Sequence, residues 1–172
     1  MFTSDLAELK EFFIKETENE RIIEGVSNDY KIIRNWTINT VILQLDKAIK
    51  LSSAIDSCVK ANKQIMPIQL EKFYNQLSYS LTAALAYSLL VDNNKKFFVQ
   101  TKVNSSIAKF NNDLISLTKN YSKNRLVLKA DEKFPLFDYN VLLSGAVKLN
   151  KEYNPIWKQE LEKNRRNFYG QL

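Results

Sequence analysis

The stretch "PIQLEKFYNQLSYSLTAALAYSLL", residues 67–90, decides the fold. Apolar residues recur along it at steps of three and four, which is the spacing of one face of an α-helix. Pro67 suits the first helical position, where a missing N–H leaves no bond unmade. The pattern therefore predicts a central helix that begins at Pro67, with small residues in its second half that let neighbours approach closely. Its expected buried side is Leu70, Phe73, Leu77, Leu81, Ala84, Leu85 and Val91.

The same stretch is a poor candidate for a membrane span. A bilayer-spanning helix needs about 20 predominantly apolar residues. The charge-free run from Phe73 to Val91 contains Asn75, Gln76 and several serines and tyrosines. We therefore expect a core helix and no membrane partner.

Two further helices are predicted, one before the central helix and one after it. Before it, a start at residues 27–30 leads into a long helical stripe: Ile38, Val41, Ile42, Leu45, Ala48, Ile49, Ile55 and Val59. The β-branched stretch from Trp36 to Ile42 taken alone also suits a strand, but the stripe that continues after it favours a helix. After it, Val103, Ile107, Phe110, Leu114, Leu117 and Tyr121 alternate steps of four and three, as the a and d positions of a coiled coil do.

The ends of the chain give weaker signals. A first helix is predicted with Ser4 or Asp5 as its N-cap, Asp5 and Glu8 as a capping box, and an end before Gly25. Residues 122–137 lose the helical period, so a short strand or an extended arm is expected there. A fifth helix is predicted over residues 139–153, and Asn154 with Pro155 predicts the start of a last one.

The whole chain is therefore expected to be an all-α, single-domain bundle of about five or six helices. Its 172 residues are enough for one core, and it has only three glycines and three prolines, too few for the turns of a β-sandwich. We expect residues 1–153 to form the bundle and residues 154–172 to form a C-terminal docking helix or tail. The single cysteine, Cys58, favours a reducing, intracellular setting.

Several kinds of chemistry are excluded by composition. Histidine is absent, which rules out imidazole bases, imidazole metal ligands and Ser–His or Cys–His pairs. No phosphate-binding glycine loop is present. Cys58 lies beside Ile55 and Val59 and is expected to be a small core residue rather than a nucleophile. We predict a protein that is not an enzyme, with no cofactor, no catalytic residue and no metal ligand.

Charge is divided unevenly along the chain. Residues 1–30 hold eight acids and three bases, whereas residues 95–129 hold eight bases and one acid. Two interpretations stay open: the acidic segment lies beside the basic one within the fold, or the basic residues bind nucleic acid phosphates or an acidic protein. Lys95, Lys102 and Lys109 recur every seven residues and so lie along one line of a helix. The candidate contact residues are Lys95, Lys96, Lys102, Lys109, Lys119, Lys123 and Arg125.

The C-terminus is a second candidate contact region. Aromatic residues and arginine are the types enriched at the centres of protein interfaces. Several occur together near the end of the chain: Trp157, Arg165, Arg166, Phe168 and Tyr169. We expect this tail to dock on a partner, with packing on its own domain as the alternative.

One family resemblance bears on function. The segment "PIQLEKFYNQLSYSLTAALAYSLLVDNNKKF", residues 67–97, resembles the central helix of head-to-tail adaptor proteins of tailed phages, with its leading proline, spaced aromatics and small-residue centre. The resemblance implies a helical subunit of a ring beneath the portal, whose C-terminal tail docks on the neighbouring ring. The segment "NPIWKQELEKNRRNFYGQL" suits such a tail.

The expected function is therefore that of a non-enzymatic assembly protein, a ring-forming phage connector subunit. Its expected partners are further copies of the chain or a portal-like neighbour, and its setting is the host cytoplasm or the virion. Two alternatives remain: a basic helical protein that binds nucleic acid through non-specific phosphate contacts, or an immunity or inhibitor protein that binds a toxin or nuclease.

Overall fold

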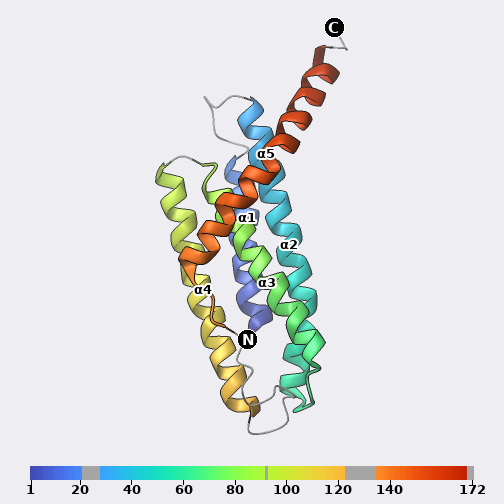
Figure 1. Ribbon diagram of the computed structural model, residues 1–172, viewed down its shortest axis with the longest axis vertical. Coiled ribbons are helices and arrows are strands. Elements are labelled where there is room, and N and C mark those ends of the chain that lie inside the picture. The colour runs from blue at the N-terminus through green and yellow to red at the C-terminus, as the bar shows by residue number, and fades with distance from the viewer. Residues whose placement is uncertain (21–27, 92, 123–134, 170–172) are drawn as a thin grey trace.

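A computed structural model describes residues 1–20, 28–91, 93–122 and 135–169, without the side chains at several helix ends and in most of the C-terminal half of the last helix. The protein is all-α, as predicted, and no strand occurs in these ranges (Figure 1). Its five helices are α1 (Phe2–Glu20), α2 (Asn28–Lys60), α3 (Pro67–Ser88), α4 (Asn93–Ser122) and α5 (Tyr139–Tyr169).

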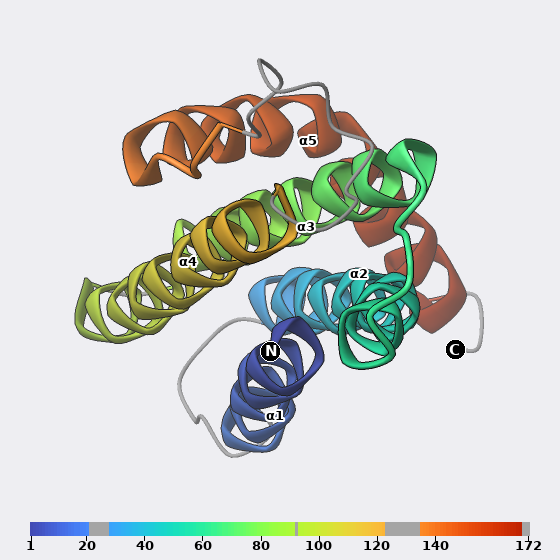
Figure 2. The ribbon, with the colours of Figure 1, turned by 90° about the horizontal axis from the view of Figure 1, so that it is seen from below.

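Helix α3 lies at the centre of the bundle. Figure 2 shows it between α2 and α5, with α4 packed along a further side. All seven residues predicted to form its buried side are buried. The helix begins at Pro67, and the Met66 N–H just before it donates to Gln69 Oε1 at 3.2 Å. Burial on several sides explains why this segment is apolar nearly all round.

Small residues let α5 cross α3 closely. A side chain on Gly145 would meet Thr82 Cγ2 of α3 at 3.5 Å, which is ordinary van der Waals distance. Further along the crossing, Asn150 Nδ2 donates to the Ala86 carbonyl at 3.1 Å. The backbone carbonyl of Ala86 on α3 therefore holds the Asn150 side chain of α5.

Helix α2 is continuous through the stretch that resembled a strand. Ile38, Val41 and Leu45 of the predicted stripe are fully buried. The helix ends where Asn62 adopts a positive φ of 52°, a conformation that asparagine tolerates better than most residues. The Lys63 N–H then donates to the Cys58 carbonyl at 2.8 Å and closes the last turn.

The start of α1 differs from the prediction. The helix begins at Phe2, so Ser4 and Asp5 lie inside its first turn and the Asp5–Glu8 capping box is wrong. The Thr3 N–H donates to Asp56 Oδ2 of α2 at 2.9 Å. A cap supplied by another helix has no local sequence signature, which is why the spacing of Asp5 and Glu8 was misleading.

The chain enters α5 through an extended segment fastened to α3 and α4. The Tyr74 and Phe137 rings stack with centroids 4.8 Å apart, and Tyr74 Oη donates to the Pro135 carbonyl at 2.8 Å. Asn111 of α4 bonds both the N–H and the carbonyl of Phe137, at 2.8 and 2.9 Å. Asp138 Oδ1 then accepts from the Val141 N–H at 3.1 Å and caps α5. The predicted strand or arm over residues 122–137 otherwise falls on 123–134, outside the described residues.

Helix α5 corrects a second boundary. The predicted helices over residues 139–153 and from Asn154 onward are one helix that continues through Pro155 to Tyr169. Proline removes one backbone hydrogen bond from a helix interior. The helix nevertheless continues on both sides of Pro155. The C-terminal half of α5, coloured red in Figure 1, extends past the end of the bundle.

Candidate interaction surface

The heptad-spaced lysines of α4 face the acidic helix α1. Lys102 Nζ lies 2.8 Å from Glu8 Oε1, and Lys109 Nζ lies 2.8 Å from Glu8 Oε2. Seven residues earlier on α4, which is about two turns, Lys95 Nζ lies 3.2 Å from Glu16 Oε2. The acidic segment therefore does lie beside the basic one, which is the first of the two interpretations left open by the sequence.

Glu8 is the centre of the exposed part of this contact. The two lysine ammonium groups donate to its carboxylate and hold its pKa at about 2, below the ordinary value of 4.5. The hydrogen bonds to Lys102 and Lys109 are the main cause of this shift, and their positive charges add to it. Because the carboxylate is well exposed, salt in solution weakens the attraction.

Glu16 and Lys95 form the buried part of the same contact. Glu16 is only 2% exposed and is among the few charged side chains buried in this bundle. Its Oε2 atom is fully covered and faces Lys95 without a well-aligned hydrogen bond. Such a carboxylate depends on the nearby ammonium group, because a buried unpaired charge is strongly destabilising.

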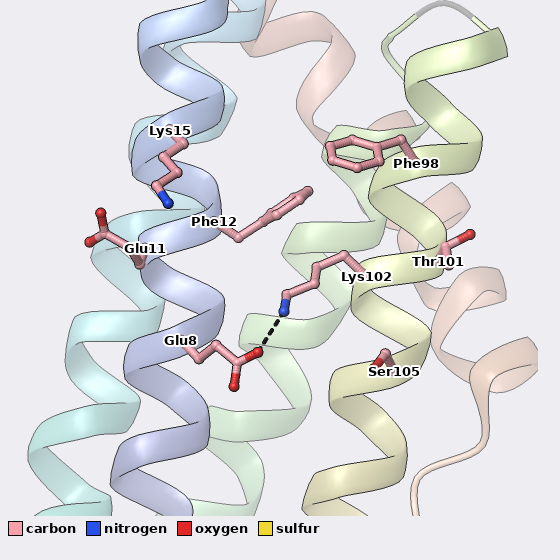
Figure 3. Close-up of a pocket in the computed structure, with 8 residues that line it drawn as sticks. All are labelled: Glu8, Glu11, Phe12, Lys15, Phe98, Thr101, Lys102 and Ser105. Carbon is pink, nitrogen blue, oxygen red and sulfur yellow. Dashed lines mark hydrogen bonds and ion pairs between the residues drawn. The ribbon is translucent and has the colours of Figure 1, made fainter.

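An open groove of about 550 Å³ lies between α1 and α4. Figure 3 shows Phe12 of α1 and Phe98 of α4 on its facing sides, with Glu8 and Lys102 below them. The two rings are 5.3 Å apart between centroids, and Phe98 is largely exposed. The groove thus combines an apolar wall with charged residues at its rim.

Three carboxyl groups gather near the N-terminus of α1. Asp113 of α4 hydrogen-bonds Asp5, and Asp56 of α2 adds negative charge. Burial and then Asp5 raise the Asp113 pKa from 3.8 to about 7. Asp56 Oδ1 and Asp113 Oδ2 are buried atoms without a hydrogen-bond partner. The cluster is therefore a place where proton uptake is coupled to the contact of three helices.

The remaining predicted site residues are spread over the molecule. Lys96 is partly buried at the start of α4, and Lys119 is exposed near its end. Lys123 and Arg125 lie outside the described residues. The five tail residues belong to the C-terminal half of α5, where the structure describes the helix but not their side chains: Trp157, Arg165, Arg166, Phe168 and Tyr169.

Sequence reasoning missed the aromatic wall of the groove. Phe97 and Phe98 follow Lys95 and Lys96 directly, and both aromatic side chains are largely exposed. Neither residue continues the seam that runs through Val103, Ile107 and Phe110, so both had to face outward or toward a neighbour. The pair was therefore a usable signal of an unusual surface.

Two kinds of site are absent from the part of the chain that the structure describes. No helix in the described ranges is both long and apolar enough to cross a membrane. Nor do the described residues contain a group of three or more carboxylate or cysteine side chains placed to hold a metal ion. No family model, curated protein or solved structure matches this chain.

Proposed function

We propose that this chain is a non-enzymatic assembly protein that acts through its helix faces and the projecting end of α5. The specific form of the proposal is a ring-forming connector subunit of a tailed phage, working in the host cell or in the virion. That form derives from the resemblance of residues 67–97 to the central helix of adaptor proteins.

The extension of α5 past the bundle carries the proposal (Figure 1). The first half of α5 packs across α3, whereas the second half runs beyond the end of the bundle. That half contains the residue types that dominate binding energy in protein interfaces, among them Trp157 and Phe168. A helix that leaves its own bundle while rich in such residues is suited to docking on another molecule.

The lysines of α4 count against the nucleic-acid alternative. Three of the seven candidate contact residues pair with Glu8 and Glu16 of the same chain. Each phosphate contact they made would have to displace one of these carboxylates. Non-specific binding of nucleic acid depends on the number of free cations that replace counterions, so internal pairing reduces it.

Mass measurement by light scattering tests the proposal. The full chain should form a multimer larger than a dimer, alone or with its partner, and a chain ending at Asn154 should not. The matched point variants are Trp157→Glu and Phe168→Glu, which keep the length of the helix. A full chain that stays monomeric at every concentration, with thermal stability unchanged by the truncation, would contradict tail-mediated assembly.

A DNA-binding titration distinguishes the assembly role from the nucleic-acid alternative. We expect no binding at moderate salt, and no difference between the wild type and a Lys96→Glu, Lys119→Glu variant. Steep salt-dependent binding that this variant abolishes would favour the nucleic-acid function instead.

A further inference from the structure

The outward face of α4 is free of charge over most of its length. Every exposed residue of α4 between Asn93 and Ser116 is uncharged. The charged residues of the same stretch are all partly buried: Lys95, Lys96, Lys102, Lys109 and Asp113. Those with known partners turn toward α1. Between Asn93 and Ser116 the charges of α4 thus lie at partly buried positions, among which the Lys109 side chain is still 42% exposed, and the first exposed charged residue after this stretch is Lys119.

The other helices do not share this feature. Their exposed residues include charged side chains, for example Glu11 on α1, Lys47 on α2, Glu71 on α3 and Lys148 on α5. In a chain with 26% charged residues, an exposed charge-free face along a long helix calls for an explanation. Loss of charged residues is the compositional mark of the centre of a protein interface.

The face has a large apolar residue at each end and small residues between them. Phe97 is 75% exposed near its start, and Ile115 is 37% exposed near its end. Leu136, 50% exposed, precedes Phe137, whose backbone is bonded to Asn111, one turn before Ile115 on α4. Ala108 occupies the middle, where it lets another helix approach closely, and Ser105 lies at the edge that lines the groove toward α1.

We propose that this face binds the same face of a second copy of the chain, with the two α4 helices antiparallel about a two-fold axis. Phe97 and Ile115 lie at equal distances in sequence from Ser106, and so do Asn104 and Ala108. An axis level with Ser106 therefore places each Phe97 against Ile115 and Leu136 of the other copy. It also places Asn104 against Ala108, where both helices are narrow.

The pattern singles out a second copy as the occupant. A two-fold interface must be self-complementary, because the same patch serves both subunits. The face of α4 meets that requirement: its middle is small and uncharged, and its two apolar ends exchange places under the rotation. Figure 2 shows α4 at the edge of the bundle, between α1 and α5, where a second helix has access.

The size of the face sets the strength of the contact. At 1.5 Å per residue and about 10 Å in width, the charge-free part of α4 offers roughly 350 Å² per copy, or roughly 700 Å² in all. Leu136 and the Phe12–Phe98 wall widen it at the sides. Such an interface lies below the usual range for stable complexes, so we expect a dissociation constant on the order of 10–100 μM.

This inference rests on the proposed assembly role and adds a partner to it. A two-fold contact closes a dimer and does not extend into a ring, because ring growth needs a heterologous contact. The projecting end of α5 is the element proposed for that second contact. The two contacts use different helices, so they can be broken separately.

Sedimentation of the full chain over a concentration series tests the contact. The wild type should pass from monomer to dimer, and Ala108→Glu should raise the dissociation constant about tenfold or more, because it brings two carboxylates together near the axis. Val141→Glu is the matched control: Val141 is an exposed apolar residue of α5, outside the face. Equal helicity and melting temperature of both variants would show that folding is intact.

A mixing experiment tests the antiparallel register. Phe97→Lys and Ile115→Glu should each weaken the dimer alone, because each places a charge against an apolar residue of the other copy. An equimolar mixture should recover dimer, because the lysine of one chain then meets the glutamate of the other. A parallel arrangement predicts no recovery.

The outcomes separate this contact from tail-mediated assembly. A dimer broken by Ala108→Glu but not by Trp157→Glu supports the α4 contact, whatever the tail does. A multimer broken by Trp157→Glu and untouched by Ala108→Glu overturns it while the assembly role stands. A chain that stays monomeric at millimolar concentration overturns it outright.

Discussion

The contacts of α3 and the contact between α1 and α4 hold the bundle together by different means. Around α3 most contact residues are buried and apolar or small, beside one polar cluster of Gln44, Gln76 and Ser80. Between α1 and α4 the central residues are carboxylates and ammonium groups beside an open groove (Figure 3). Burial of apolar surface supplies free energy at every pH and salt concentration, whereas ion pairs depend on both.

Apolar and charged contacts therefore contribute differently to the fold. The apolar contacts determine that the chain folds and that α3 lies inside. The charged contacts add to the pairing of α4 with α1, beside the buried apolar seam of α4. Substitutions should therefore fall into two groups. Those around α3 should change the free energy of unfolding by a large amount that does not depend on pH. Those between α1 and α4 should change it by a smaller amount that depends on pH or salt.

The largest effect is expected for Leu81→Ala in the middle of α3. Leu81 is fully buried, and removal of such a side chain leaves a cavity that lowers the free energy of unfolding by about 2–5 kcal/mol. Leu43→Ala is the matched control, because Leu43 is 53% exposed on α2. Urea unfolding at pH 5 and pH 8 should show the same loss for Leu81→Ala at both. A loss of unfolding free energy that changed with pH would contradict the proposed difference between the apolar contacts of α3 and the charged contacts between α1 and α4.

The next effect is expected for Glu16→Gln in the buried part of the α1–α4 contact. The substitution keeps the shape of the side chain but removes the charge that faces Lys95, and we expect a loss of about 1–3 kcal/mol. Glu18→Gln is the control, since Glu18 is exposed on the same helix. A double-mutant cycle with Lys95→Met measures the coupling. If the two substitutions are additive, the pair does not stabilise the contact.

The fold was predictable from the sequence because the helices have regular apolar stripes. Leu70 through Val91 and Val103 through Leu117 follow a period that the bundle buries as expected. The errors fell at the ends of helices. Asp56 caps α1 from a different helix, which is a tertiary contact that local spacing does not contain, and α5 continues through Pro155, where the sequence predicted a new helix to begin.

The candidate site was predictable only in its charges. The spacing of Lys95, Lys102 and Lys109 correctly placed them on one line, but the sequence left open whether they meet α1 or an outside partner. Only the three-dimensional arrangement shows Glu8 between two of these lysines. The charge-free face of α4 was also hidden, because exposure is a property of the packed bundle and not of the helix alone.

The third effect is expected for Asp113→Asn, which should raise the stability of the protein, whereas the two substitutions above lower it. The Asp113 pKa is raised from 3.8 to about 7, so the native state holds a proton that the unfolded state has lost. Stability from this group is therefore complete below about pH 3.8 and falls as pH rises toward 7. Because Asp113 is partly exposed, we expect Asp113→Asn to stabilise the protein at pH 8 by about 1–2 kcal/mol. At pH 4 the variant should match the wild type; a shift of equal size at both pH values would refute the titration.

The smallest effect is expected for Glu8→Gln, and its sign follows from the opposite shift. The Glu8 pKa is lowered from 4.5 to about 2, so its ion pairs stabilise the fold above pH 4.5 and lose that effect as pH falls toward 2. Glu8 and Asp113 together therefore favour a stability maximum near pH 4, where one is still ionised and the other still protonated. Glu8→Gln should flatten the acid side of that maximum in thermal melts, whereas Glu11→Gln, on the same helix and the same groove, should not. Because Glu8 is exposed, raising the salt from about 0.05 M to about 0.5 M should remove most of the difference. A Glu8→Gln loss that persists in high salt would mean that the α1–α4 contact depends on packing, as α3 does, and that the two regions differ less than their charges suggest.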